Sequence, residues 1–175
     1  MARINSVDPR APTLSPSAVR VVGGQLIEAD GTAPGTYVLD VIIPAYAVIL
    51  DVLIHSEELW TADTSAKLDV GLYESSGGTI GSVIDADEIW VDVNLKATDL
   101  TKGQSLNFNF DSQGGIPGGM LSEGSNTHNL DVVADDERQI RFSVLTVGTV
   151  GTAGETYVYV VYAVPEMDTA TFTAT

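Results

Sequence analysis

Alternating apolar and polar residues dominate this chain from residue 18 onward. The clearest case is 66–74, where Lys67 and Asp69 point to one face. Three apolar residues form the opposite face: Leu68, Val70 and Leu72. A period of two is what a half-buried strand requires, so the pattern predicts a β-strand over this segment.

The same pattern recurs along the chain and predicts about eight strands in all. The other clear segments are 18–29, 36–43, 48–56, 106–110, 140–147 and 155–164. Within 18–29, Gly23-Gly24 is expected to form a bulge or kink. Within 48–56 we expect Leu50, Val52 and Ile54 to share one face.

The segment 85–95 is ambiguous. Ile89, Val91 and Val93 alternate as in a strand. Against this, Asp85 is a suitable helix N-cap, and Glu88 stands at the third helical position, where it can complete a capping box. We favour a short helix here and keep the strand as the alternative.

The segment 155–164 is apolar on both faces. Tyr157, Tyr159 and Val161 alternate with a second apolar set, Val158, Val160, Tyr162 and Val164. Such a strand lies in the centre of a sheet or faces a partner subunit. We therefore include Tyr157 and Tyr159 among the candidate interface residues.

Many strands with no alternation of strand and helix indicate an all-β fold. We expect an antiparallel β-sandwich, jelly-roll-like, with one short helix and an extended N-terminal arm. The expected boundaries are an arm at 1–17, a β-sandwich domain at 18–165 and a C-terminal tail at 166–175.

The arm is predicted from its prolines and its charge. Pro9, Pro12 and Pro16 disfavour both a helix and a central strand. Residues 1–20 carry three arginines against one aspartate, opposite in sign to the rest of the chain. We expect the arm to dock on an adjacent subunit or on another protein through Arg3, Ile4, Val7, Arg10 and Leu14.

The composition excludes several classes of function. The 175 residues include 8 basic and 24 acidic side chains, for a net charge of −16, which argues against general binding to nucleic acid phosphates or anionic membranes. There is no cysteine, which excludes disulfides, thiolate metal sites and cysteine nucleophiles.

Candidate catalytic and ligand-binding groups are few. His55 and His128 stand far apart in the sequence, and we expect neither to be catalytic. Two acidic clusters are candidates for calcium: Asp85, Asp87, Glu88 and Asp92, and then Asp135, Asp136 and Glu137. Their side chains are adjacent rather than convergent, so we expect solvated loops, no metal and no cofactor. Trp60, in a predicted loop end, is a candidate interface or packing anchor.

Several motifs, taken in order, resemble virion structural proteins of tailed bacteriophages. They cover most of residues 36–164 and are Ile43-Pro44-Ala45 leading into Val48–Val52, Glu58-Leu59-Trp60, Leu68-Asp69-Val70-Gly71, Asp85-Ala86-Asp87, Thr101-Lys102-Gly103, and the Tyr-rich segment Gly154–Tyr162. Each motif alone is ordinary strand-and-turn chemistry, and the resemblance lies in their order.

The resemblance implies a small all-β head-decoration, or cement, protein, commonly a homotrimer. Such a protein binds the outer surface of the major capsid protein lattice of the virion and stabilises it. The family implies no catalytic residues. Two alternatives stay open: a tail or head-fibre virion protein that binds host glycans, and a calcium-dependent binding module.

Overall fold

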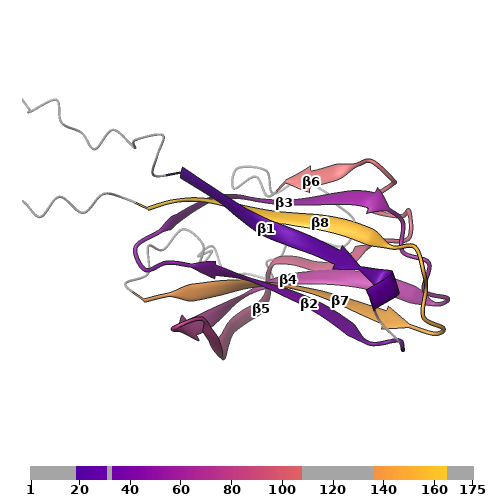
Figure 1. Cartoon of the computed structure of the whole chain (residues 1–175), viewed down its shortest axis with the longest axis horizontal. Coiled ribbons are helices and arrows are strands. Elements are labelled where there is room, and N and C mark those ends of the chain that lie inside the picture. Colours follow the sequence, from indigo (N-terminus) through magenta and orange to yellow (C-terminus); the bar gives the residue numbers. More distant parts are fainter. Residues whose placement is uncertain (1–18, 31–32, 108–135, 165–175) are drawn as a thin grey trace, which may run out of the picture.

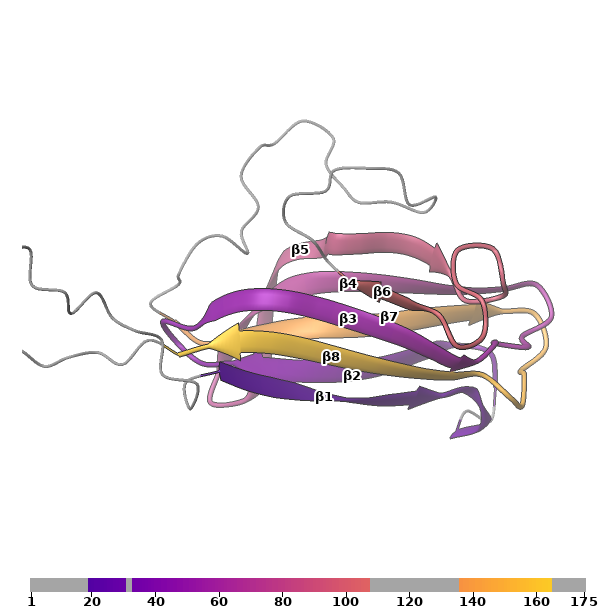
Figure 2. The same ribbon diagram turned by 90° about the horizontal axis from the view of Figure 1, so that it is seen from above.

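A computed structural model describes residues 19–30, 33–107 and 136–164. Eight strands form two antiparallel four-stranded sheets that pack face to face (Figures 1 and 2). The strands are β1 (Val19–Ile27), β2 (Thr36–Ile43), β3 (Val48–Glu58), β4 (Ser65–Ser76), β5 (Thr79–Asn94), β6 (Ser105–Asn107), β7 (Arg138–Val147) and β8 (Glu155–Ala163). The predicted antiparallel β-sandwich is confirmed.

The two sheets draw their strands from different parts of the chain. One sheet has the order β1-β8-β3-β6 and the other β2-β7-β4-β5. Consecutive strands therefore lie in opposite sheets, except for the hairpin β4–β5. Apart from that hairpin, the neighbours within each sheet come from distant parts of the chain. Within the described residues, no helix is long and apolar enough to cross a membrane.

The inward faces of the strands meet in one apolar core. On β4, Leu68, Val70 and Leu72 are fully buried, as the alternation predicts. They are paired in register with three buried residues of β7: Val144, Phe142 and Ile140. Val158 and Val160 of β8, in the opposite sheet, are also fully buried in this core. Each such side chain contributes about 1.5–3 kcal/mol by leaving water.

The strand β8 lies between β1 and β3, in the centre of its sheet. Its inner residues are buried, whereas Tyr157 and Val161 on the outer face are half-buried and Tyr159 is 37% exposed. Of the two explanations for a doubly apolar strand, the central position is therefore confirmed.

The helix expected over 85–95 is wrong, because this segment belongs to β5. Register shifts between β4 and β5 interrupt the alternation, and Asp92 has a left-handed backbone with φ 56°. The core consequently receives three side chains from this segment, those of Ile89, Trp90 and Val93. Their spacing of one and three residues is the spacing of residues that share one face of a helix. The bulges keep the pairing with β4, and the apolar side chains still reach the core.

A bulge in β3 places Leu50 on the opposite face from the one expected. The register of β3 against β8 shifts between Ile49 and Asp51. The extra residue reverses the alternation, so Ile49 is buried with Val52 and Ile54 while Leu50 is 39% exposed.

Gly23-Gly24 forms no bulge. The pairing of β1 with β8 runs without a shift from Val19 to Ile27. The glycines instead permit close packing: a Cβ at Gly23 would lie 1.9 Å from the carbonyl oxygen of Val158. The expectation came from the flexibility of glycine, whereas the structure uses its lack of a side chain.

Candidate functional site

The outer face of the β1-β8-β3-β6 sheet carries the two candidate tyrosines. The Tyr157 and Tyr159 rings lie parallel within 4°, with centroids 6.4 Å apart. Tyr159 lies against Gly23 of β1. If Gly23 carried a Cβ atom, that atom would be 2.9 Å from Cδ1 of the Tyr159 ring. A glycine on the neighbouring strand therefore leaves room for an aromatic ring on this surface.

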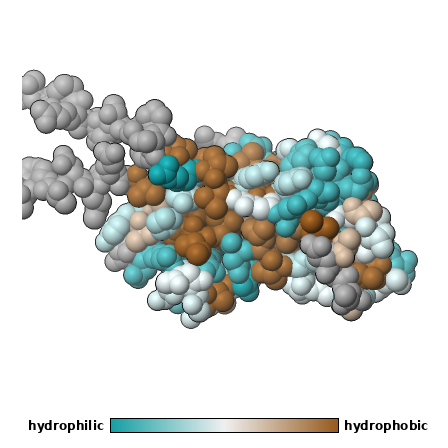
Figure 3. Space-filling model, in the orientation of Figure 1, coloured by the Kyte–Doolittle hydropathy of each residue, from teal (hydrophilic) through white to brown (hydrophobic). Residues whose placement is uncertain are grey.

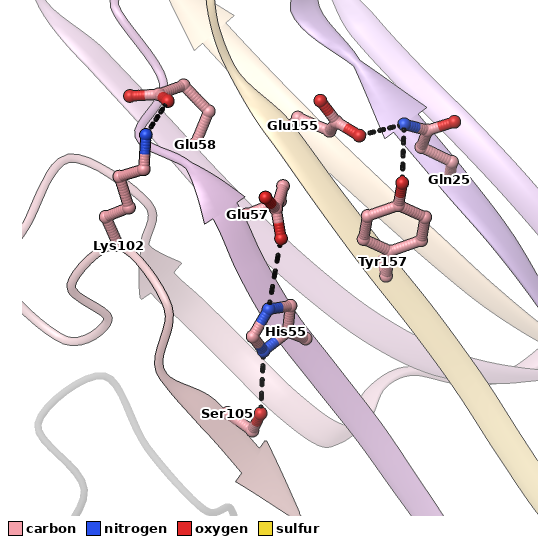
Figure 4. Close-up of polar contacts among 8 residues, drawn as sticks. All are labelled: Gln25, His55, Glu57, Glu58, Lys102, Ser105, Glu155 and Tyr157. Atoms are coloured by element: carbon pink, nitrogen blue, oxygen red, sulfur yellow. Dashed lines mark hydrogen bonds and ion pairs between the residues drawn. The ribbon is translucent and has the colours of Figure 1, made fainter.

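Polar side chains lie beside Tyr157 (Figure 4). Gln25 of β1 donates through Nε2 to the Glu155 carboxylate and, at 3.3 Å, to the Tyr157 hydroxyl. The hydrogen bond and the negative charge of Glu155 raise the pKa of Tyr157 above its ordinary value. Tyr157 therefore stays protonated, and its hydroxyl stays available as a donor, throughout the neutral range.

His55 of β3 links Ser105 and Glu57 on the same face (Figure 4). Its Nδ1 lies 2.8 Å from Ser105 Oγ, and its Nε2 lies 3.5 Å from Glu57 Oε2. Serine, histidine and carboxylate in this order resemble a catalytic triad. However, the His55 and Glu57 side chains are 32% and 54% exposed, so water screens the pair. A triad needs an imidazole held in a dry site, and we interpret these contacts as a solvated surface network.

Trp60 is a core residue, only 2% exposed, and we do not retain it in the candidate interface. Its ring packs edge to face on Tyr37 of β2, with centroids 5.0 Å apart. Its Nε1 donates to Thr156 Oγ1 of β8 at 2.8 Å. Trp60 thus connects the two sheets, which is the packing role left open by the sequence.

Glu28 is the main polar residue that sequence reasoning missed. It follows β1 in the 3-10 turn η2 (Glu28–Asp30) and is fully buried. Its carboxylate accepts bonds from Thr61 N (2.7 Å), Thr61 Oγ1 (2.9 Å), Ala62 N (2.7 Å) and Gly154 N (3.1 Å). No local motif marks the residue, because its donors lie more than thirty residues away in the sequence.

Burial alone would raise the pKa of Glu28. The hydrogen bonds from Thr61, Gly154 and Ala62 together outweigh burial and hold the pKa below its ordinary value of 4.5. The carboxylate is therefore charged at neutral pH, and it joins the β3–β4 and β7–β8 connections to the end of β1.

Among the side chains that the structure describes, no three metal-ligating groups lie together. Asp92 pairs with Lys67 at 2.8 Å. Glu137 accepts bonds from Ser75 Oγ (2.5 Å) and Gly78 N (2.8 Å), and so it holds the β4–β5 turn. The side chains of residues 85–88, and Asp135, lie outside the described residues.

Comparisons with known proteins show a similarity to a solved structure. No protein-family model matches the chain, and no curated protein matches its sequence. The solved structure titled "Capsid of Ralstonia phage GP4" is similar, with a TM-score of 0.49 and 16% sequence identity over 84% of each chain. A similarity of this size carries no argument about function.

The remaining candidate residues lie outside the described part of the chain. They are Arg3, Ile4, Val7, Arg10 and Leu14 of the expected arm, and His128. The expected arm at 1–17 and tail at 166–175 are untested for the same reason. Of the three candidate interface residues that the structure describes, Tyr157 and Tyr159 lie together and Trp60 lies in the core.

Proposed function

We propose that this chain is a structural protein of a bacteriophage virion that decorates the capsid and stabilises it. Its partner would be the outer surface of the major capsid protein lattice. The proposal rests on the sequence resemblance and on the place of its motifs in the fold.

The observation that carries the proposal is that these motifs form one connected part of the sandwich. Ile43-Pro44-Ala45 forms the crossing from β2 to β3, Leu68–Gly71 lies in β4, and the Tyr-rich segment forms β8. Their inward residues pack in the same core. The motifs that carry the resemblance are therefore parts of one folded sandwich with a common core, and not isolated turns.

The action of such a protein is mechanical. Contacts across capsid subunits bury area that must be exposed again before the lattice opens under internal DNA pressure. Burying apolar area stabilises the contact by about 25 cal/mol per Å². A few hundred Å² per copy therefore still stabilises the lattice after part of this free energy is offset by the entropy cost of ordering the arm. Repetition over the lattice multiplies these modest contributions.

Immunogold labelling of intact virions, followed by a virion reconstruction, tests the proposal directly. Label over the outer head surface supports decoration. Label confined to the tail or to head fibres favours the second candidate below. A virion preparation that contains no copy of the chain refutes a structural role.

The N-terminal arm is the anchor we propose for this contact. Exposed charge pairs contribute only about 0–1 kcal/mol each, so Ile4, Val7 and Leu14 should matter at least as much as the arginines. Deleting residues 2–15 should leave the melting temperature of the free protein nearly unchanged and weaken its retention on capsids. Equal retention of the truncated and full chains, at low and high salt, would show that the arm is not an anchor.

Binding of a host glycan is the second candidate, and the parallel Tyr157 and Tyr159 rings favour it. Flat aromatic rings beside amide, imidazole and hydroxyl groups suit the apolar and polar faces of a sugar. An array of bacterial surface polysaccharides should then bind the wild-type chain and lose binding with Tyr159→Ala. Tyr46→Ala is the matched control, because Tyr46 is similarly exposed, at 40%, in the β2–β3 turn.

A further inference from the structure

The strand β1 is an exposed and apolar sheet edge. In the described residues it pairs only with β8, so the backbone groups on its other side have no strand partner. Its first residues are unusually exposed for valines: Val19 at 37%, Val21 at 64% and Val22 at 39%. Val22 faces the same way as the buried Val160 beside it but is exposed, and among the strands that the structure describes none lies beyond β1.

The edge of the second sheet lies next to it. The strand β2 pairs only with β7 within the described chain, and it packs beside β1 at the same side of the sandwich (Figure 1). Val38 and Ile42 of β2 are 45% and 42% exposed. Figure 3 shows hydrophobic surface gathered over both strands toward the end where β1 begins. We call this edge of the sandwich the edge face. Its exposed apolar residues are Val22 on the core side of β1, Val19 and Val21 on the outer side of β1, and Val38 and Ile42 on the outer side of β2.

The edge face has one of the usual protections of a free strand, the inward charge of Arg20, which pairs opposite the core residue Tyr162. Soluble proteins protect such edges with proline, inward charges, bulges or very short strands. The strand β1 is nine residues long, has one charged residue, Arg20, and runs beside β8 with no bulge. A long, regular, apolar edge of this kind is a template for pairing with another strand.

The charges on the edge face favour a second copy of this chain as the occupant. The whole chain has a net charge of −16, so most contacts between two copies bring carboxylates together. On β1 and β2 the exposed charges are Arg20 and Asp40, and Asp40 is paired with Arg141 at 2.7 and 2.8 Å. Two edge faces can therefore meet without the repulsion that other faces of this acidic protein would meet.

The size of the edge face is also adequate. A nine-residue strand is about 30 Å long, and two packed sheets with their side chains are about 20 Å across at the edge. The contact would then cover about 600 Å² on each copy, or about 1,200 Å² in total. That lies at the lower limit of specific protein interfaces and suits a moderate, reversible association.

We propose that a second copy docks its own edge face here, about a two-fold axis that sets β1 antiparallel to β1 of the partner copy. The contact continues the sheet from one copy into the next and covers the exposed valines. This self-association does not depend on the proposed virion role. A two-fold contact of this kind gives a dimer, whereas the resemblance implies a homotrimer.

The absence of native cysteine allows a direct test. Single cysteines are placed at Val19, Val21 or Val22 of the full chain, and a short bismaleimide is added at micromolar protein. We expect covalent dimers from at least one of the three. Val83→Cys is the matched control, since Val83 is 55% exposed on β5 at the opposite edge of its sheet. No dimer at any of the three, or dimer equally abundant at Val83, overturns the proposal.

Sedimentation equilibrium supplies a second measurement. Val21→Glu should weaken self-association about tenfold or more, because it places a carboxylate in an apolar contact, whereas Val83→Glu should leave it unchanged. Melting curves check that both variants fold. A wild-type chain that stays monomeric at ~100 µM, or a trimer unaffected by Val21→Glu, overturns the edge contact and leaves the capsid proposal standing.

Discussion

Replacing Glu28 by glutamine tests whether a buried carboxylate holds three connections of the sandwich together. The side chain keeps its shape but loses its charge and one acceptor. In the wild type, one carboxylate oxygen accepts from Ala62 N, and the other accepts from Thr61 N, Thr61 Oγ1 and Gly154 N. In either orientation, the new amide nitrogen faces at least one backbone N–H, so a buried donor loses its acceptor.

The expected cost is about 2–3 kcal/mol at pH 7, from one lost charge-assisted bond and one unsatisfied buried donor. For a domain of this size, each kcal/mol lowers the melting temperature by about 2–4 °C, so we expect a drop of roughly 5–10 °C. Thermal and urea unfolding followed by circular dichroism measure it. Glu74→Gln, at an exposed position on β4, is the control and should change the free energy of unfolding by less than about 0.5 kcal/mol.

The pH dependence makes the test specific for the charge. The pKa of Glu28 is lowered in the folded protein, so its contribution is present above the ordinary value of 4.5 and is lost as the pH falls through the lower folded pKa. The difference between wild type and Glu28→Gln should therefore be largest at neutral pH and shrink as the pH falls below 4.5. A difference below about 1 kcal/mol at pH 7, or one that stays constant over this range, would refute the reasoning.

Three further predictions concern packing and ligands. Gly23→Ala should destabilise the fold by about 2 kcal/mol or more in a urea titration, because the added Cβ would lie 1.9 Å from the Val158 carbonyl oxygen. Gly35→Ala is the control and should cost far less, since its added Cβ would have its nearest neighbouring atom at 4.0 Å. Trp60→Phe should cost about 2–4 kcal/mol, since the bond to Thr156 and part of the buried ring are lost; a melting temperature within 2 °C of wild type would contradict this. Addition of a chelator should shift the unfolding midpoint by less than ~10 °C, because we expect no metal to be needed for folding, and a larger drop would reveal a site in an acidic loop.

The candidate site was predictable only in part. The alternation of β8 placed Tyr157 and Tyr159 together on one face, and the structure agrees. The same reasoning could not separate an interface tryptophan from a core tryptophan. Trp60 follows β3 in a connection, and its burial depends on Tyr37 and Thr156, which reach it from two other strands.

Sequence alone determined the all-β class and most of the strands, because the pleat of a strand imposes a period of two on any half-buried segment. Tertiary structure decided where that period fails. At Leu50 the pairing with the distant strand β8, and in 85–95 the pairing with the hairpin partner β4, contain bulges, and these bulges change which residues face the core. Tertiary structure also brought Glu28 to donors from two other connections, and left β1 and β2 as neighbouring edges. Such features depend on contacts between residues far apart in the chain, which no local pattern records.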